Sequence, residues 1–248
     1  MNAVSRSTAA PASRGVQTIR FFARFTRGQR WEHGLLILSF TVLFLTGVVQ
    51  KYRNEPWSQD ILSTPERLLL VQTIHRIAAI VLTLEVLDHL IRAIVLLARR
   101  KMSPALFPTL KDVRDAGQML KYLLFLSNQK PRFGKYNFEQ KVTYWFLFFG
   151  IGIMVVTGFI LWFPVQVTSV VSGGIVPAAK LAHSTEAIVA GIFVLIWHFY
   201  HVHLERLNLS IFTGRLNEDD MRQYHSAEFE RLTGEPAKPE ARDQGGQS

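Results

Sequence analysis

The sequence predicts an all-α membrane protein: a four-helix bundle with an interfacial helix between its second and third spans and a short C-terminal helix. Three observations support this expectation: apolar residues gather in four blocks, cations gather between particular blocks, and histidines recur at helical spacing within blocks. The chain has 248 residues, 48% of them hydrophobic, and a mean hydropathy of +0.15. It is too apolar for an ordinary soluble domain and too charged to lie entirely in lipid.

Each apolar block is near or above the roughly 18–20 residues that a helix needs to cross a bilayer. The blocks run over Leu35–Val49, about Leu68–Leu97, about Tyr144–Phe163 and about Leu181–Val202. The first is the shortest and counts as a span only with its flanks included. Because four crossings return a chain to its starting side, both termini are expected on one side of the membrane.

Positive charge follows this topology. The formal net charge is +9, and cations gather in the N-terminal tail and in the connection from Arg99 to Lys141. The positive-inside rule therefore predicts that both termini and the middle connection of this multi-pass protein are cytoplasmic. The membrane in which it is expected is the bacterial inner (plasma) membrane. A nucleic-acid partner is not expected, because the charge forms no single patch.

The segments outside the blocks have their own patterns. Residues 1–25 are expected to form a disordered basic tail, 26–232 the four-span domain, and 233–248 a disordered polar tail. The first 30 residues lack the apolar core of a secretory signal. A helix is predicted from Thr109, and it suits either the cytoplasmic leaflet or a docked position on the neighbouring loop. Glu218–Arg231 is predicted to be a short polar helix.

Four histidines form two pairs at helical spacing. His75 and His89 are 14 residues apart in the second block, and His183 and His198 are 15 apart in the fourth. On an α-helix these steps return to within about 40° and about 60° of the same face, with roughly 21–23 Å of rise. If the two helices lie side by side, His75 meets His183 at the periplasmic level and His89 meets His198 at the cytoplasmic level.

Facing imidazoles at two depths predict two stacked b-type haems, since imidazole is a common axial ligand of haem iron. Ionisable groups inside a span are costly and usually functional. The chain has no cysteine, which excludes thiolate ligation, iron–sulfur clusters and covalent haem attachment within it. Arg76 and Arg92 lie close to the histidines and could pair with haem propionates or simply anchor the span ends.

Two further histidines compete for these ligand positions. His33 begins the first block at the cytoplasmic level, where it competes with His89 as the partner of His198. His201 lies about five full turns after His183, on the same face, and could replace His198 as a ligand.

Several stretches resemble the family of cytochrome b subunits that includes formate dehydrogenase gamma subunits and nickel–iron hydrogenase cytochrome b subunits. They are RWEHGLLILSFTVLFLTG, IHRIAAI followed by DHLIR, FEQKVTYWFLFFGIGIMVVTGFILWF, HSTEAIVAG and WHFYHVHLERLNLSIFTGRLNEDDMRQYHSAEFERL. The closest likeness is to the branch whose genes often accompany multihaem c-type cytochromes. The resemblance implies b-type haems and electron exchange between the quinone pool and a redox partner, either a multihaem cytochrome c or an iron–sulfur or dehydrogenase subunit.

The resemblance also implies a set of ligand candidates. They are His33, His75, His89, His183, His198 and His203. The formate dehydrogenase pattern implies that His33 and His198 hold the cytoplasmic haem. The pattern of cytochrome bc complexes implies His89 and His198, and the 14- and 15-residue spacings favour this second arrangement. A third haem on His33 and His203 would use all six.

Quinone chemistry couples two electrons to two protons, so a quinone site needs a proton donor or acceptor. Glu186, one turn after His183, is the first candidate, for a site on the periplasmic side. Glu85 and Asp88 are the others. The predicted function is that of an electron-transfer subunit in a quinone-linked oxidoreductase complex. Its rivals are a haem-free proton or ion transporter lined by histidines and glutamates, and a structural membrane anchor.

Overall fold

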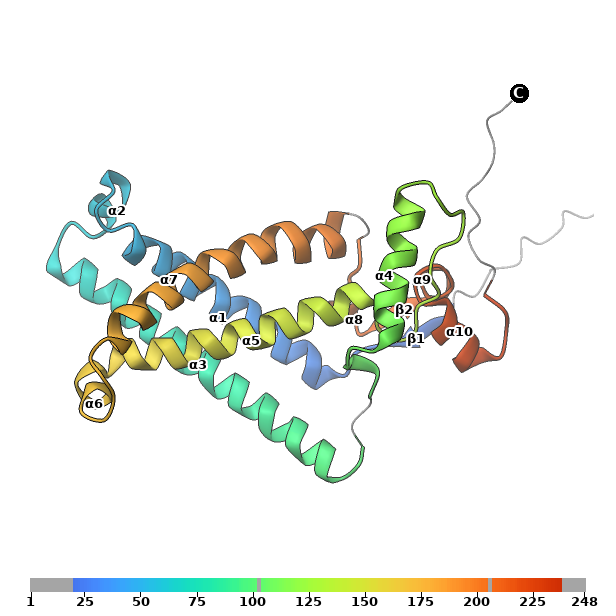
Figure 1. The fold of residues 1–248 in the computed structure, drawn as a ribbon, viewed down its shortest axis with the longest axis horizontal. Helices are drawn as coiled ribbons and strands as arrows, with labels where there is room; N and C mark the ends of the chain where they lie inside the picture. Colours follow the sequence, from blue (N-terminus) through green and yellow to red (C-terminus); the bar gives the residue numbers. More distant parts are fainter. Residues whose placement is uncertain (1–19, 102–103, 205–206, 238–248) are drawn as a thin grey trace, which may run out of the picture.

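Four long helices form the body of the protein (Figure 1). A computed structural model describes residues 20–101, 104–204 and 207–237. The long helices are α1 (Arg27–Lys51), α3 (Pro65–Ala98), α5 (Phe138–Trp162) and α7 (Ile175–Ile192). α7 continues through two π-helical stretches, η2 (Phe193–His198) and η3 (Tyr200–Leu204). α1 packs mainly against α3, α5 packs mainly against α7, and α1 also contacts α7.

Local sequence signals set where the long helices begin. Thr26 caps α1 and Asn137 caps α5, and in both cases the glutamine three residues later completes a capping box. Thr64 caps α3, with Pro65 at the first helical position. These side chains satisfy main-chain N–H groups that a helix leaves unpaired at its start. As a result, each of these helices begins before its apolar block.

Three of the described helices are long and apolar enough to cross a membrane: α1, α5 and the continuous helix from Ile175 to Val202. α3, with 34 residues, is not among them. It carries Arg76, Glu85, Asp88 and Arg92 along its length. Large apolar side chains stay exposed along all four long helices, as expected where lipid surrounds the bundle. The predicted all-α membrane bundle is confirmed, and the role of α3 as a fourth span stays a prediction.

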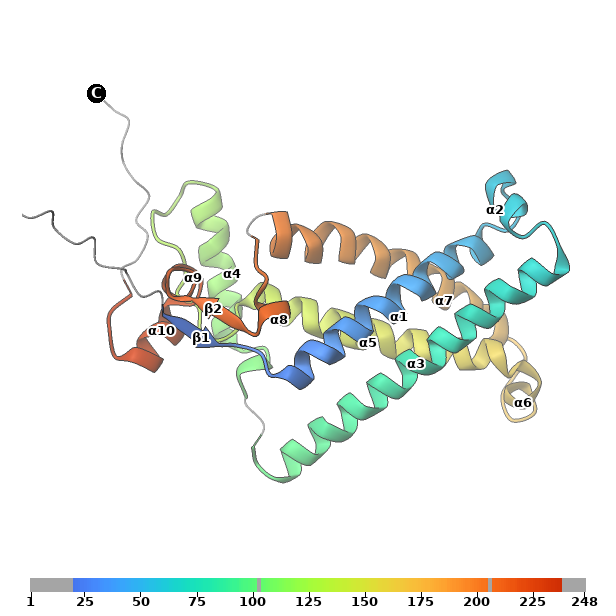
Figure 2. The same cartoon turned by 180° about the vertical axis from the view of Figure 1, so that it is seen from behind.

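Two short helices close one end of the bundle (Figure 2). α2 (Pro56–Ile61) joins α1 to α3, and α6 (Pro164–Thr168) joins α5 to α7. The hydroxyl of buried Ser58 donates a hydrogen bond to the carbonyl of Val49 at 2.7 Å, which ties α2 to the end of α1. These connections are the two that are poor in cations, so the charge distribution predicts that this end is periplasmic.

The opposite end carries a cap built from both ends of the described chain (Figure 1). Its elements are strands β1 (Phe21–Ala23) and β2 (Arg215–Asn217) and helices α8 (Ser210–Thr213), α9 (Glu218–Tyr224) and α10 (Ser226–Thr233). The two strands pair antiparallel. The single helix expected over Glu218–Arg231 is in fact two. They separate at His225, whose backbone is not helical and whose Nδ1 lies 2.8 Å from the carbonyl of Gly134.

A buried apolar cluster holds the cap together. Leu216, Met221, Phe229 and Ala237 form this cluster, and Phe22 packs against it, its ring meeting that of Phe229 at 5.8 Å. Burial of these side chains offsets the entropy lost in ordering both chain ends. Residues 20–25 and 233–237, which the sequence assigned to disordered tails, are instead part of this cap. The remainder of both tails lies outside the described residues.

Ion pairs join the first and the last described segments of the chain within the cap. Arg20 and Arg222 each contact both Glu218 and Glu235, with N···O distances of 2.7–3.0 Å. Hydrogen bonds from Arg20 and Arg222 lower the pKa of Glu218 to about 2. Because this carboxyl stays ionised down to that pH, the contact is expected to persist throughout the physiological range.

Helix α4 (Leu110–Leu123) follows the short 3₁₀ turn η1 (Pro104–Leu106) and matches the helix predicted from Thr109. Asp112 completes a capping box with Thr109 and pairs with Lys141 of α5 at 2.8 Å. Burial raises the pKa of Asp112, but hydrogen bonds from Lys141 and Thr109 outweigh it and hold that pKa below its usual value. The apolar side chains that stay exposed on α4 are Leu110, Val113, Leu120 and Leu123. This uncovered face suits the predicted position on a lipid leaflet.

Close packing between α1 and α7 depends on Gly191. A Cβ at this position would overlap the ring of Phe44 in α1, whereas a Cβ at Gly152 of α5 would meet nothing within 4 Å. We expect Gly191→Ala to destabilise the bundle by about 1–3 kcal/mol through overpacking. Gly152→Ala should stay within about 0.5 kcal/mol of the wild type. Thermal unfolding in detergent measures both variants, and equal midpoints for the two would contradict the close α1–α7 crossing.

Candidate functional site

Two pairs of histidine rings meet inside the bundle, at two levels. His75 of α3 and His183 of α7 have ring centroids 6.4 Å apart, with an interplanar angle of 68°. His33 of α1 and His198 of η2 have centroids 6.2 Å apart, at 66°. The 15-residue step from His183 to His198 separates the two levels by roughly 20 Å of helix. Each pair joins two long helices, so rigid elements rather than loops position the imidazoles.

Threonine hydroxyls support the pair nearer to α2 and α6, in the same way on both sides. Nδ1 of His75 lies 2.8 Å from Oγ1 of Thr46 in α1. Nδ1 of His183 lies 2.9 Å from Oγ1 of Thr157 in α5. Each imidazole is therefore oriented by a hydrogen bond to a helix that carries neither member of the pair.

A glycine follows each of these threonines and lets the imidazole approach its neighbouring helix. A Cβ at Gly47 would lie 3.5 Å from Cε1 of His75, which is ordinary van der Waals contact. A Cβ at Gly158 would lie 3.2 Å from Cε1 of His183, which is tighter than such contact. At position 158, any larger residue would therefore press on the ring.

The second pair lies at the end of the bundle that carries the cap. The ring of His33 also lies 6.5 Å from that of Phe212 in α8, so the cap reaches this level. His198 is the last residue of the π-helical stretch η2. π-helical turns are rare, and they occur frequently at functional sites.

The structure does not bring His89 to His198. Nε2 of His89 instead lies 3.0 Å from the hydroxyl of Tyr144, and its Nδ1 lies 3.8 Å from a carboxyl oxygen of Glu32. The prediction from spacing required α3 and α7 to lie side by side along their whole length. In the structure α1 contacts both helices, and α1 supplies the neighbour of His198. The spacing therefore anticipated the His75 pair but not the partner of His198.

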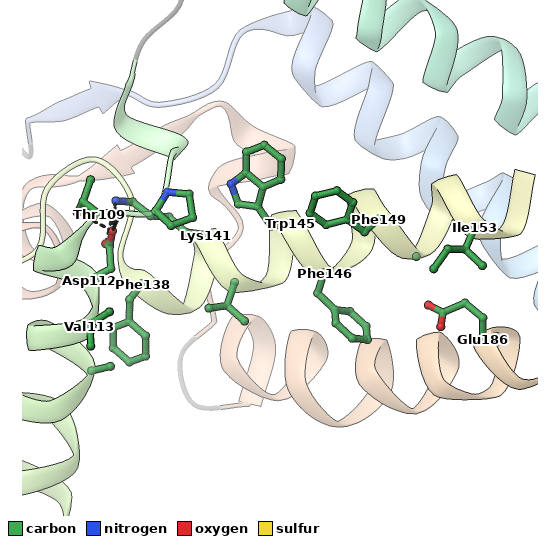
Figure 3. A pocket seen from close by; sticks show the side chains of 14 residues that line it. Thr109, Asp112, Val113, Phe138, Lys141, Trp145, Phe146, Phe149, Ile153 and Glu186 are labelled. Atoms are coloured by element: carbon green, nitrogen blue, oxygen red, sulfur yellow. Dashed lines mark hydrogen bonds and ion pairs between the residues drawn. The ribbon is translucent and has the colours of Figure 1, made fainter. Parts of the chain in front are cut away.

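A cavity of about 630 Å³ runs along α5 from α4 toward α7 (Figure 3). Its apolar wall includes Val113, Phe138, Trp145, Phe146, Phe149 and Ile153. Asp112 and Lys141 line it near α4, and the carboxyl of Glu186 lines its far end. A Cβ at Gly150 would lie 2.5 Å from Oε1 of Glu186, so this glycine makes room for the carboxyl. The cavity that Glu186 lines thus extends toward α4, and the predicted quinone site on the periplasmic side stays a prediction.

The other predicted acidic residues lie on α3, close to His89. Arg92 pairs with Glu32 of α1 at 2.5 Å and with Asp88 one turn before it. Oε2 of Glu85 is buried and has no hydrogen-bond partner among the described residues. These side chains form a polar cluster around Arg92 and His89, and they do not line the cavity that Glu186 lines.

The sequence matches the model of the prokaryotic cytochrome b561 family over residues 24–214. The chain belongs to this family. A similar protein is the "Formate dehydrogenase, cytochrome b556 subunit" of Haemophilus influenzae, 27% identical over 140 residues that cover 54% of this chain and 51% of that protein. The match thus spans about half the length of that relative. Membership of the cytochrome b561 family confirms the resemblance seen in the sequence and identifies a membrane electron-transfer cytochrome with b-type haem.

The histidine pairs fit the haem that a b561 cytochrome holds. Axial ligation by two histidines needs imidazoles that face each other and present a nitrogen lone pair to the iron. In His75 and His183 the threonine hydroxyls contact Nδ1, so Nε2 is the nitrogen that could bind an iron. His33 and His198 provide a second facing pair on different helices.

Other predicted residues of this b561 cytochrome contact aromatic rings. The guanidinium of Arg76 lies 5.5 Å from the ring centroid of Trp162. The ring of His201 lies 4.7 Å from that of Trp197 on the same helix. The structure therefore does not bring His201 into either histidine pair. The side chain of His203 lies outside the described residues.

Sequence reasoning missed Thr46 and Thr157. The available signal was the Thr-Gly dipeptide, which stands in both the first and the third apolar blocks. It precedes His75 by 29 residues and His183 by 26. This b561 cytochrome therefore contains the same arrangement twice. A helix that carries the Thr-Gly dipeptide, α1 or α5, supports a histidine on a neighbouring helix, α3 or α7.

Proposed function

We propose that this cytochrome carries two b-type haems and passes electrons between the quinone pool and a redox partner subunit of a membrane complex. The observation that supports this most strongly is the meeting of histidine rings at two levels along α7. His75 and His183 would hold one haem, and His33 and His198 the other. Bound haem supplies one-electron redox chemistry. Two levels roughly 20 Å apart extend over most of a hydrocarbon core about 30 Å thick.

The orientation in the membrane follows from four crossings. α3 would form the fourth span, because it packs along α1 and carries His75 to the level of His183. The cap, with both chain ends, would then face the cytoplasm of a bacterial cell, where the cation-rich segments belong. The polar cluster around Arg92 and His89 would lie near the cytoplasmic surface of the membrane. The ring pair of His75 and His183 would lie near the periplasmic surface.

The cavity along α5 would take the quinone. Its apolar wall suits a hydrophobic ring and tail, and its few polar groups stand at the two ends. Glu186 would accept or donate the proton that accompanies electron transfer. Glu85 and Asp88 are the alternative proton carriers, on the α3 side of the bundle.

The redox partner is proposed from the similar protein. That relative is named as a cytochrome subunit of formate dehydrogenase. A partner here would be a multihaem cytochrome c or an iron–sulfur or dehydrogenase subunit that exchanges electrons with the nearer haem. A haem-free transporter or a structural anchor would not need facing imidazoles supported by threonines.

Haem content tests the proposal directly. Purified protein should contain two non-covalent haems b per chain, which acidified acetone releases, because two histidine pairs meet in the bundle. A pyridine haemochrome assay with protein quantified by amino-acid analysis gives the ratio. One haem or fewer per chain would overturn the two-haem proposal. Three would favour the arrangement that uses all six histidines, in which His33 and His203 hold a third haem and His89 is the partner of His198. A preparation with no Soret band would contain no haem, and that result would favour a transporter or a structural anchor instead.

A further inference from the structure

We propose that Thr46 and Thr157 are matched positioning residues that fix the tautomer and the donor strength of both ligands of one haem. That haem is the one assigned above to His75 and His183, so the inference rests on the proposed function and deepens it. It concerns four side chains from all four long helices, since α1 and α5 supply the threonines while α3 and α7 supply the histidines.

Each threonine hydroxyl has one proton, and the structure shows where it goes. Oγ1 of Thr46 lies 2.6 Å from the carbonyl oxygen of Val42, and Oγ1 of Thr157 lies 2.6 Å from that of Ile153. A carbonyl oxygen can only accept, so each hydroxyl donates to its own helix. Toward the imidazole the hydroxyl oxygen can therefore only accept, and the imidazole must donate from Nδ1–H.

This tautomer decides which ring nitrogen can bind iron. A neutral imidazole protonated at Nδ1 carries its lone pair on Nε2. Both rings would consequently present the same atom, Nε2, to a haem iron. The agreement between two independent helix pairs argues that the hydroxyls serve the site and not merely local helix packing.

The hydrogen bond also affects the electron-donating strength of the ligand. An acceptor on the second ring nitrogen raises the basicity of a ligating imidazole. A stronger donor stabilises ferric more than ferrous iron, so these hydroxyls would hold the midpoint potential of this haem lower than it would otherwise be. Since both axial ligands have the same support, the two effects would add in the same direction.

Isosteric variants separate the effect of the hydroxyl from the effect of side-chain shape. Thr46→Val and Thr157→Val remove the acceptor, whereas Thr46→Ser and Thr157→Ser keep it. Thr83→Val is the matched control: its hydroxyl donates to the carbonyl of Ala79 at 2.7 Å on α3, without a hydrogen bond to a histidine among the described residues.

Redox titration and the low-spin ferric EPR spectrum provide the readouts. Each valine variant should raise the midpoint potential of one haem and leave the other unchanged, and should weaken retention of the affected haem by roughly 10-fold or more. If ferric affinity falls 10-fold more than ferrous affinity, the shift is about 59 mV for one electron. The serine variants and Thr83→Val should match the wild type.

Several outcomes would overturn the inference. Wild-type potentials, EPR spectra and haem retention in both valine variants would do so, and so would serine variants that shift as far as the valine ones. Because the two threonines lie on different helices, failure of one variant to fold leaves the other to decide. Wild-type protein without haem would overturn the proposed function as well. Haem that is lost in His75→Ala yet unaffected by the threonine variants would overturn this inference alone.

Discussion

Replacing His33 with alanine should remove one of the two haems, and replacing His89 should remove neither. The ring of His33 meets that of His198 at 6.2 Å, while His89 points to the hydroxyl of Tyr144. Loss of one imidazole would leave this b-type haem without one of its two axial ligands, and no covalent bond retains it. A pyridine haemochrome assay and the reduced-minus-oxidised spectrum should show one haem fewer in His33→Ala and the wild-type content in His89→Ala.

The two variants serve as controls for each other, because both remove an imidazole at the same end of the bundle. If His89→Ala loses the haem and His33→Ala keeps it, the ligand belongs to α3, as the 14- and 15-residue spacings suggested. Loss of one haem in both variants would instead show that the polar cluster around Arg92 and His89 helps to retain that haem. Either result would contradict the assignment in which His33 ligates the haem and His89 has no part in holding it.

Replacing Glu186 with glutamine should slow electron transfer from a quinol by roughly 100-fold or more, the lower range for loss of general acid–base catalysis. The carboxyl lines the end of an apolar cavity and packs over Gly150, so a quinone head group that enters the cavity can come within reach of it. Glutamine keeps the shape and the hydrogen-bonding capacity but cannot take up the proton. Stopped-flow absorbance with a water-soluble quinol measures the rate at which the protein becomes reduced.

Glu85→Gln is the comparison for this experiment, since Glu85 also lies on a long helix of the bundle, with its Oε2 buried, but does not line the cavity. It should reduce at close to the wild-type rate. An unchanged rate in Glu186→Gln, with both haems present, would leave Glu186 a structural residue. A slow rate in Glu85→Gln alone would move the quinone site to the α3 side.

Much of the fold follows from patterns that act over short distances. Apolar blocks and capping residues such as Thr26 and Asn137 place the long helices, and the breaks around Pro104 and Pro108 precede α4. The cap escaped prediction because β1 lies some 190 residues before β2 in the chain. Its strands are three residues long, and their stability comes from packing of Phe22 on a distant cluster. Contacts of that kind leave no periodic signal in a single sequence.

The candidate site was predictable to the extent that it depends on one helix. His183 and His198 were singled out by their spacing along the chain, and the structure brings the ring of His75 next to that of His183, as the spacing predicted. The partner of His198 depends on which helix packs beside α7 near the cap, and helical periodicity contains no information on that order. The π-helical stretch before His198 also changes the rotation per residue that the prediction had taken as constant.

One continuous helix contributes to both histidine pairs: His183 lies in α7 and His198 in the π-helical stretch η2 that continues it, while their partners come from α3 and α1. If each pair holds a haem, as proposed, the distance between the two irons is set by the hydrogen-bonded main chain of this one helix. The ligand geometry at each haem depends instead on how that helix packs against a different neighbour. A change in bilayer thickness that tilts the helices would then alter the ligand geometry, and with it the two midpoint potentials, well before it altered the tunnelling distance between the haems.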